Sequence, residues 1–169
     1  MPELDTTTPW IGFRFLVEFT DESVTAAAGG DGGSPEYLCD GAFSEVSGLE
    51  ASMEPKQIKE GGLNYGVHQR AGAVSFATVV LKRGMTASRD LWRWWSLVAG
   101  AGDEANGAMA HRLSVRITQQ AADATPLLTW KIARAMPVKF KAGDLNAKTG
   151  EVSIEELHLV HEGLKLETP

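Results

Sequence analysis

Apolar side chains recur at every second position in several stretches of the chain, which is the period of a half-buried β-strand. The clearest stretch covers residues 13–20, where one predicted face collects Phe13, Phe15, Val17 and Phe19. The same period predicts strands over 113–118, 128–132 and 138–140. Several short alternating strands in one chain indicate a β-rich fold.

Less regular patterns predict further strands. Residues 42–53 alternate loosely around Gly48, and residues 37–39 form a short candidate strand before an Asp-Gly turn. Residues 74–81 are almost continuously apolar, which predicts a buried strand that the Lys-Arg-Gly of residues 82–84 ends.

The last predicted strand, residues 152–161, changes phase along its length. Val152 and Ile154 occupy one phase, and Leu157 and Leu159 occupy the other. An extra residue in a strand shifts the phase by one, so we expect a β-bulge near Glu155-Glu156.

One stretch has the period of an amphipathic helix, with apolar residues at i, i+3, i+4 and i+7. The positions predicted to pack against the sheet are Leu91, Trp94, Trp95 and Val98. Thr86 or Ser88 can cap the N-terminus, and Asp90 is favourably placed in the first turn. Gly100 or Gly102 can end the helix.

Residues 54–71 form a polar segment with Gly61-Gly62 at its centre and few apolar residues beyond Ile58, Leu63 and Val67. A polar arm with a Gly-Gly tip is typical of a long protruding hairpin. Because an isolated two-stranded hairpin is marginally stable in water, an ordered arm requires a partner that packs against it.

These elements predict a single domain over residues 1–169. We expect a mainly β, antiparallel sandwich or barrel with one flanking α-helix and the long hairpin. The glycine-rich residues 26–35 are expected to form a flexible loop, and residues 1–10 a flexible N-terminus.

Composition narrows the function classes. The 169-residue chain is 43% hydrophobic and 22% charged, as expected of a globular protein, and its net charge of −6 argues against a surface that grips a phosphate backbone. A single cysteine, Cys39, excludes an intrachain disulfide. We find no apolar run long enough to span a bilayer and no secretion signal, so we expect synthesis and assembly in the bacterial cytoplasm.

Motifs for catalysis or metal binding are lacking. His158 and His161 are three residues apart in a strand pattern, where odd separations face opposite sides, and no third ligand is identifiable. The chain has no Gly-x-Ser-x-Gly elbow around Ser44 or Ser47, and the glycine run 29–33 lacks the Lys-Ser/Thr of a phosphate loop. We therefore expect no enzymatic activity, no cofactor and no metal.

Acidic pairs and tryptophans offer two weaker possibilities. The carboxylates of Glu155-Glu156 and Asp103-Glu104 diverge when they are adjacent on a strand, which disfavours a glycosidase. The tryptophan-rich helix is either an aromatic binding platform or, as is commoner for such a stripe, part of the core.

Whole segments resemble the tail-tube proteins of contractile phages and of phage-derived contractile injection systems. Spread over residues 11–166, the resembling segments begin with Phe13-Arg-Phe-Leu-Val-Glu-Phe, Gly41-Ala-Phe-Ser-Glu-Val-Ser-Gly-Leu-Glu, Glu60-Gly-Gly with Arg70-Ala-Gly, and Leu81-Lys-Arg-Gly-Met-Thr with Leu91-Trp-Arg-Trp. They continue with Trp130-Lys-Ile-Ala-Arg-Ala-Met-Pro-Val-Lys, Leu145-Asn-Ala-Lys and Glu151-Val-Ser-Ile-Glu-Glu-Leu-His-Leu-Val-His-Glu-Gly-Leu.

The resemblance implies a structural virion or injection-particle component that self-assembles into hexameric rings, which stack around a channel for DNA or an effector protein. The sheath, the baseplate or hub and other tube proteins are the implied partners, and the helix would face the sheath. The arm would reach an adjacent subunit or ring. The arm residues implied in ring stacking are Glu54, Lys56, Ile58, Glu60, Gly61, Gly62, Leu63, Tyr65, His68 and Arg70.

The sequence also departs from the family pattern at residues 26–35, which lengthen a loop, and at residues 135–137, which replace an aromatic residue before proline. Three alternatives to a main tube subunit remain. One is an initiator ring that joins the tube to the baseplate, and another is a secreted ring protein of the type VI kind. The third is a small β-barrel enzyme or carbohydrate-binding module.

Overall fold

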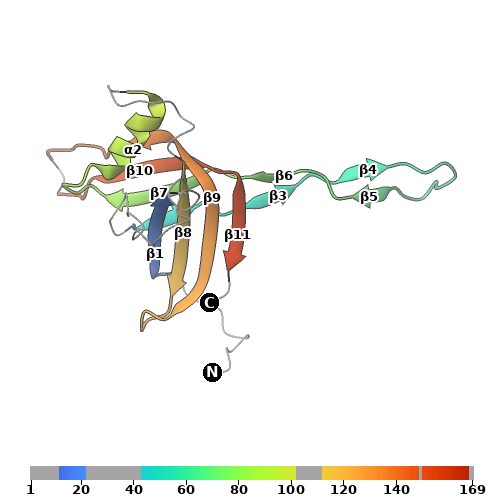
Figure 1. The fold of residues 1–169 in the computed structure, drawn as a ribbon, viewed down its shortest axis with the longest axis horizontal. Coiled ribbons are helices and arrows are strands. Elements are labelled where there is room, and N and C mark those ends of the chain that lie inside the picture. The colour runs from blue at the N-terminus through green and yellow to red at the C-terminus, as the bar shows by residue number, and fades with distance from the viewer. Residues whose placement is uncertain (1–11, 22–42, 102–111, 149, 168–169) are drawn as a thin grey trace, which may run out of the picture.

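The computed structural model describes residues 12–21, 43–101, 112–148 and 150–167, and it confirms a mainly β, antiparallel fold with one helix and a protruding hairpin (Figure 1). The predictions made for residues 1–10, 26–35 and 37–39 lie outside these ranges. The strands are β1 (Phe15–Asp21), β2 (Glu45–Ser47), β3 (Ala51–Met53), β4 (Lys56–Ile58), β5 (His68–Arg70), β6 (Val74–Phe76), β7 (Val79–Gly84), β8 (Leu113–Gln120), β9 (Pro126–Lys141), β10 (Ile154–Val160) and β11 (Gly163–Glu167). The helix is α2 (Asp90–Ala99).

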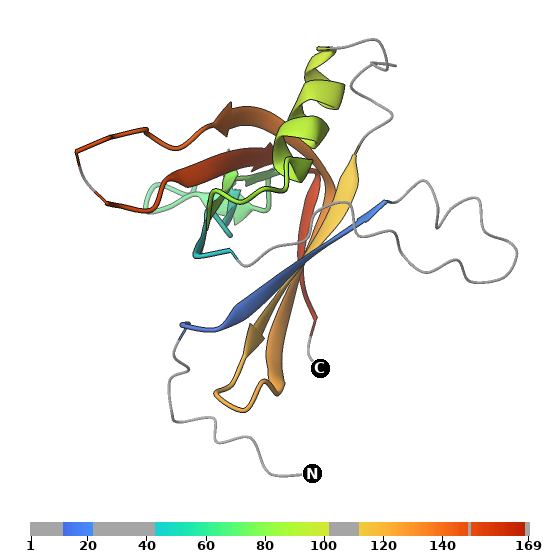
Figure 2. The same ribbon diagram turned by 90° about the vertical axis from the view of Figure 1, so that its left-hand side faces the viewer.

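Seven strands of the described chain are joined by hydrogen bonds: six follow the path β1-β8-β9-β10-β7-β2, and β11 pairs with β9 off this path. The path is open, so no closed barrel is present among these strands. The first part of β9 pairs with β8 and β11, and its last part pairs with β10. Figure 2 shows that β9 bends between two sheets that run in different directions.

Strand β9 is longer than the pattern predicts. The predicted strands at 128–132 and 138–140 are parts of one continuous strand of 16 residues. The apolar alternation breaks at Arg134, a non-glycine residue with a positive φ of 52°. The strand therefore bends at Arg134 and continues, which the pattern alone does not distinguish from an end.

The core lies between the two sheets and under the helix. Phe19 of β1, Val115 of β8, Ile132 of β9 and Leu157 of β10 are fully buried there. The ring of Phe19 meets the indole of Trp94 edge-on, with 5.7 Å between ring centroids. This contact joins the helix to the first sheet.

The helix begins and ends close to the predicted positions. Gly100 ends it in the left-handed conformation with φ 75°, and Asp90 occupies the first turn. The predicted cap is wrong, because the N-cap residue is Arg89 and no side chain caps the helix. Instead, the backbone N–H of Ser88 donates to Oγ1 of Thr86 at 3.3 Å.

The apolar run at 74–81 and the loose pattern at 42–53 each divide into two strands. Gly48, with φ 84°, separates β2 from β3, and residues 77–78 separate β6 from β7. Strand β7 ends at Gly84, within the predicted residues 82–84, but it continues past Leu81 because the charged side chain of Arg83 points inward and is neutralised by two carboxylates.

The predicted bulge at Glu155-Glu156 is also wrong. Glu155, Leu157 and Leu159 share the buried phase of β10, whereas Ile154 is exposed. The apolar pattern changes phase without a bulge because the inward position opposite Arg83 holds a carboxylate instead of an apolar residue. The register shift in this strand lies between His158 and Leu159, opposite β9.

Candidate assembly surface

The arm is a two-stranded ribbon that projects away from the two sheets (Figure 1). Near the body β3 pairs with β6, and farther out β4 pairs with β5. The ribbon is therefore longer than the predicted residues 54–71, since ladder pairing begins at Ala51 opposite Phe76.

Two backbone contacts hold the base of the arm. Gly48 adopts a left-handed φ of 84° and packs closely against the backbone of Thr78, so that a Cβ at this position would overlap the carbonyl oxygen of Thr78. The backbone N–H of Ala77 donates to the carbonyl of Glu50 at 3.1 Å. The ring of Phe76 lies 5.1 Å from that of His161, which connects the arm to the body.

The two strands of the arm also lie close together farther from the body. Ser52 and Ser75 share a hydrogen bond of 2.9 Å between their hydroxyls. A Cβ at Gly72 would overlap the carbonyl oxygen of Glu54, so only glycine fits where the strands cross between the two ladders.

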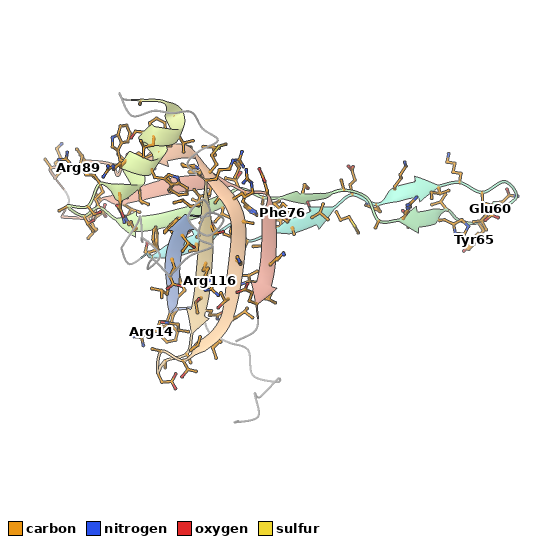
Figure 3. All side chains as sticks on the ribbon, viewed as in Figure 1. Arg14, Glu60, Tyr65, Phe76, Arg89 and Arg116 are labelled. Atoms are coloured by element: carbon orange, nitrogen blue, oxygen red, sulfur yellow. The ribbon has the colours of Figure 1, made fainter. Side chains whose placement is uncertain are left out.

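The tip turns around glycine and carries one hydrogen bond between the side chains of His68 and Glu60. The backbone N–H of Leu63 donates to the carbonyl of Glu60 at 3.2 Å, and Gly62 has a φ of 93°. Nε2 of His68 lies 2.7 Å from Oε2 of Glu60. Tyr65 is fully exposed, at 103% of its reference area, and Figure 3 places it with Glu60 at the far end of the arm.

Every residue from Glu50 to Ala71 is exposed. Among them are large apolar side chains that remain 42–49% exposed in the described chain: Leu63, Ile58 and Met53. A ribbon of this kind gains little free energy from its own packing. The arm is therefore a candidate surface for contact with another molecule.

The structure brings the predicted arm residues into one feature, although it leaves their role in stacking a proposal. Lys56 and Ile58 lie on β4, His68 and Arg70 lie on β5, and Glu54 precedes β4. The remaining members form the turn and tip: Glu60, Gly61, Gly62, Leu63 and Tyr65. The sequence pattern missed the inner ladder of β3 and β6, which sets the reach of the arm.

The helix residues that were predicted to pack against the sheet differ in how deeply they are buried. Leu91 and Trp94 are buried in the core, and Trp95 and Val98 are partly buried against it. Trp92, the candidate for a binding platform, is 48% exposed and packs against Trp95 and Phe140 at centroid distances of 5.1 and 5.3 Å. It is a surface aromatic side chain packed against its neighbours, and no open aromatic platform surrounds it in the described chain.

A buried ion cluster connects the helix to the sheet. Arg83 is 1% exposed and donates through Nε to Oε1 of Glu155 at 2.5 Å and through its terminal nitrogens to Asp90. Burial favours the neutral acid of Asp90, but hydrogen bonds from Arg83 and Ser88, together with the charge of Arg83, hold the pKa of this carboxyl below its ordinary value. No sequence motif marked this cluster; the polar residue at an inward strand position was its only sign.

The described residues contain neither a metal-binding cluster nor a membrane-spanning helix. Within the described ranges, no group of three or more histidine, cysteine or acidic side chains could hold a metal ion. Nε2 of His158 lies 3.6 Å from Glu156, and Nδ1 of His161 lies 3.1 Å from the carbonyl oxygen of Gly163. No helix in the described part of the chain is long and apolar enough to cross a membrane.

Comparison with known proteins gives a consistent set of relatives. Residues 12–165 match the model of the family described as T4-like virus tail tube protein gp19. No curated protein gives a significant match.

Solved structures share the fold over nearly the whole chain. A chain in the six-fold symmetrised baseplate of the anti-feeding prophage is 28% identical, with a TM-score of 0.73 over 96% of this chain and 97% of that one. A chain in the sheath-tube complex of the PVC extracellular contractile injection system is 17% identical, with a TM-score of 0.71 over 97% and 95%. A chain in the tube-terminating cap of the anti-feeding prophage is 15% identical, with a TM-score of 0.72 over 99% and 96%.

Proposed function

The chain belongs to the T4-like virus tail tube protein family, and from that premise we propose that it is the repeating subunit of the inner tube of a contractile phage tail or injection particle. In this proposal six copies form a ring, and rings stack around a central channel. The channel carries DNA or an effector protein. The role is structural, as it is for the family, and involves no catalysis.

A six-fold ring is supported by the relative at 28% identity, which comes from a baseplate solved with six-fold symmetry. The open sheet supports the same arrangement. In the described chain β1, β2 and β11 each pair with a strand on one side only. The free side of such a strand presents backbone N–H and C=O groups that can hydrogen-bond to another strand, and strands of neighbouring copies in a ring would provide these partners.

The exposed arm is the observation that supports the stacking of rings. It extends from the body by two short ladders, and no other element of the described chain covers it. A partner outside the subunit is therefore needed to order it, and a copy in an adjacent ring provides one. In this proposal the two sheets of the described chain form one domain, because strand β9 belongs to both of them.

Deleting Gly61 to Tyr65 tests the stacking role of the arm. We expect a folded subunit, because these residues lie outside the core, but no tubes by negative-stain electron microscopy. Thermal melting followed by circular dichroism, compared with the wild-type chain, controls for folding. Long tubes formed by the deletion variant would show that the arm does not hold the stack.

A second candidate is the initiator ring at the baseplate of the same machine. The baseplate origin of the 28% identical relative is the observation that favours it. Copy number separates the candidates, because a main tube subunit is present in many rings per particle and an initiator in one. Quantitative mass spectrometry of purified particles measures this ratio against the sheath protein.

A further inference from the structure

The arm and a polar cleft lie at opposite ends of the same pair of strands. Strand β2 begins at Glu45 beside the cleft and leads toward the arm, and β7 returns from the arm to end at Gly84. At that far end Gly84 pairs with Ile154, where β10 begins. In Figure 1 the described residues that join β9 to β10 accordingly lie at the left of the body, while the arm extends to the right.

The cleft has a volume of about 520 Å³ and a mainly polar wall. Its lining comes from the ends of β2, β7, β9 and β10 and from the residues between the last two: Ser44, Glu45, Lys82, Lys141, Asp144, Asn146, Glu151, Val152, Ser153, Ile154 and Glu156. It is therefore a built feature of the second sheet and not a gap in a loop.

The charges in this wall are unbalanced toward the negative. Nζ of Lys82 lies 2.9 Å from Glu45, and Nζ of Lys141 lies 3.7 Å from Glu156, so both lysines have acidic partners within the wall. Asp144 and Glu151 remain in excess, which leaves four carboxylates against two ammonium groups and a net charge of −2.

The outer arm has the opposite balance. Between Lys56 and Arg70 the chain holds three cations, including Lys59, against the single carboxylate of Glu60, which gives a net charge of +2 with His68 neutral. The cations project from an exposed ribbon, where a partner can reach them.

Uncovered apolar side chains accompany the charges on both surfaces. Leu63 and Tyr65 are exposed at the tip of the arm, and Val152 and Ile154 are exposed at the cleft, with Val152 at 75%. Contact between these groups would remove apolar area from water on both sides. Charge and apolar surface therefore match between the two ends of one molecule.

We propose that the cleft is the receptor for the arm of a second copy of this chain. Each copy then gives its arm at one end and receives an arm at the other. A contact between two different surfaces of identical molecules is head-to-tail, and it repeats from copy to copy to form a ring or an open stack. The ten residues from Ala51 to Glu60 span roughly 30 Å as extended chain, which is enough to cross to a neighbouring body. This assignment rests on the proposed function and names where the arm binds.

Reciprocal charge reversal tests the contact. The cleft variant Asp144→Lys/Glu151→Lys and the arm variant Lys56→Glu/Lys59→Glu each place like charges opposite one another. We expect the concentration needed for tube formation to rise about tenfold or more in each, since close interfacial charge pairs are commonly worth at least a factor of ten. Combining all four substitutions in one chain restores opposite charges and should restore tubes, measured by pelleting and electron microscopy.

A covalent test does not depend on the strength of the ionic contact. In a Cys39→Ser background, Tyr65→Cys and Val152→Cys place one thiol at the arm tip and one at the cleft. Mild oxidation of assembled protein should give a ladder of disulfide-linked oligomers on a non-reducing gel. Either single-cysteine variant should give no species above a dimer, because it lacks one half of a head-to-tail link.

The outcomes separate this assignment from the proposed function. If deleting Gly61 to Tyr65 abolishes tubes, while the four-substitution chain shows no rescue and the double-cysteine chain gives no ladder, the arm binds elsewhere on a copy. The cleft assignment is then wrong and the tube function stands. Tubes formed by the deletion variant would instead contradict the stacking role itself.

Discussion

Arg83 shows how one buried charge can connect three elements. Its guanidinium on β7 binds Glu155 on β10 and Asp90 at the start of α2, and it lies 5.8 Å from the ring centroid of Phe43. Removing one partner from a buried ion pair leaves an uncompensated charge in a poorly solvated place, which is strongly destabilising. The cluster therefore fixes the helix on the sheet as long as all its members remain charged.

The cluster predicts an acid-sensitive component of stability. The folded pKa of Asp90 is below its unfolded value of about 3.9, so its contribution is present above about pH 4 and is lost as the pH falls through the folded pKa. We expect Asp90→Asn to lose about 1.5–3 kcal/mol at pH 7, the range for hydrogen bonds to charged groups. The variant should also lose less stability than wild type on acidification below pH 4, as measured by urea unfolding.

A surface ion pair provides the control for this prediction. Glu45 pairs with Lys82 but its side chain is 51% exposed, and exposed pairs contribute little to stability. Glu45→Gln should leave the urea midpoint at pH 7 nearly unchanged. An equal loss in both variants would mean that burial does not strengthen the Arg83 cluster.

The same residues mark a limit of sequence pattern. The alternation in residues 152–161 predicts a strand, but it also predicts a bulge near Glu155-Glu156, which the structure does not have. A carboxylate at an inward position is tolerated only because Arg83 lies opposite it on β7, as the register Glu155↔Arg83 shows. That pairing is a long-range fact, which local alternation does not contain.

At the scale of elements, the arm depends on two glycines with similar conformations and different surroundings. Gly48 and Gly62 have φ values of 84° and 93°. A Cβ would overlap Thr78 at Gly48, whereas it would meet nothing within 4 Å at Gly62. The first glycine is enclosed where the arm leaves the body, and the second is open at the tip.

This difference predicts unequal effects of alanine. Gly48→Ala should destabilise the body by roughly 1–3 kcal/mol or more, because backbone strain is added to a steric overlap with the backbone of Thr78, just before β7. Gly62→Ala should leave the unfolding of the body unchanged, since the tip contributes nothing to the core. Urea unfolding followed by tryptophan fluorescence measures both, and an equal loss at the two positions would contradict the distinction.

The sequence predicted the existence of the arm but not its length. The polar composition of residues 54–71 and the Gly-Gly pair at 61–62 were sufficient to identify the outer ladder. Residues 51–53 and 74–76 looked like body strands because they contain apolar side chains such as Met53 and Val74. In the structure both are about half exposed, so they are apolar without being part of the core.

At the scale of the molecule, the body and the arm differ in how much of their backbone is protected. Strands β8, β9 and β10 are paired on both sides and enclose the core, whereas the arm has two ladders of three residue pairs each. Local opening costs least free energy where few buried contacts hold a segment.

We expect this difference to appear in hydrogen exchange. In the unassembled subunit, amides of residues 50–71 should exchange much faster than those of β8, because arm opening does not disturb the core. On assembly the arm should gain protection while β8 stays slow, which makes β8 the internal control for hydrogen-exchange mass spectrometry. An arm already as protected as β8 in the free subunit would show that it is ordered without a partner.

The orientation of the two sheets was beyond what the pattern could predict. Alternation identified strands at 128–132 and 138–140 but gave no sign that one strand of 16 residues joins them through Arg134. Where such a strand bends is decided by which residues it pairs with, and at the bend those partners are distant along the chain, as in the pairs Leu113↔Ala135 and Gly163↔Ala133.

That continuity of β9 has a mechanical consequence. Its first part is bonded to β8 and β11 and its last part to β10, so the two sheets share a covalent backbone as well as a core. A force that pulls one sheet across the other loads the peptide chain of β9 together with its flanking hydrogen bonds, and these must rupture together before the sheets slip. A body built in this way deforms little when it is pushed from one end, which suits the tube subunit that we propose.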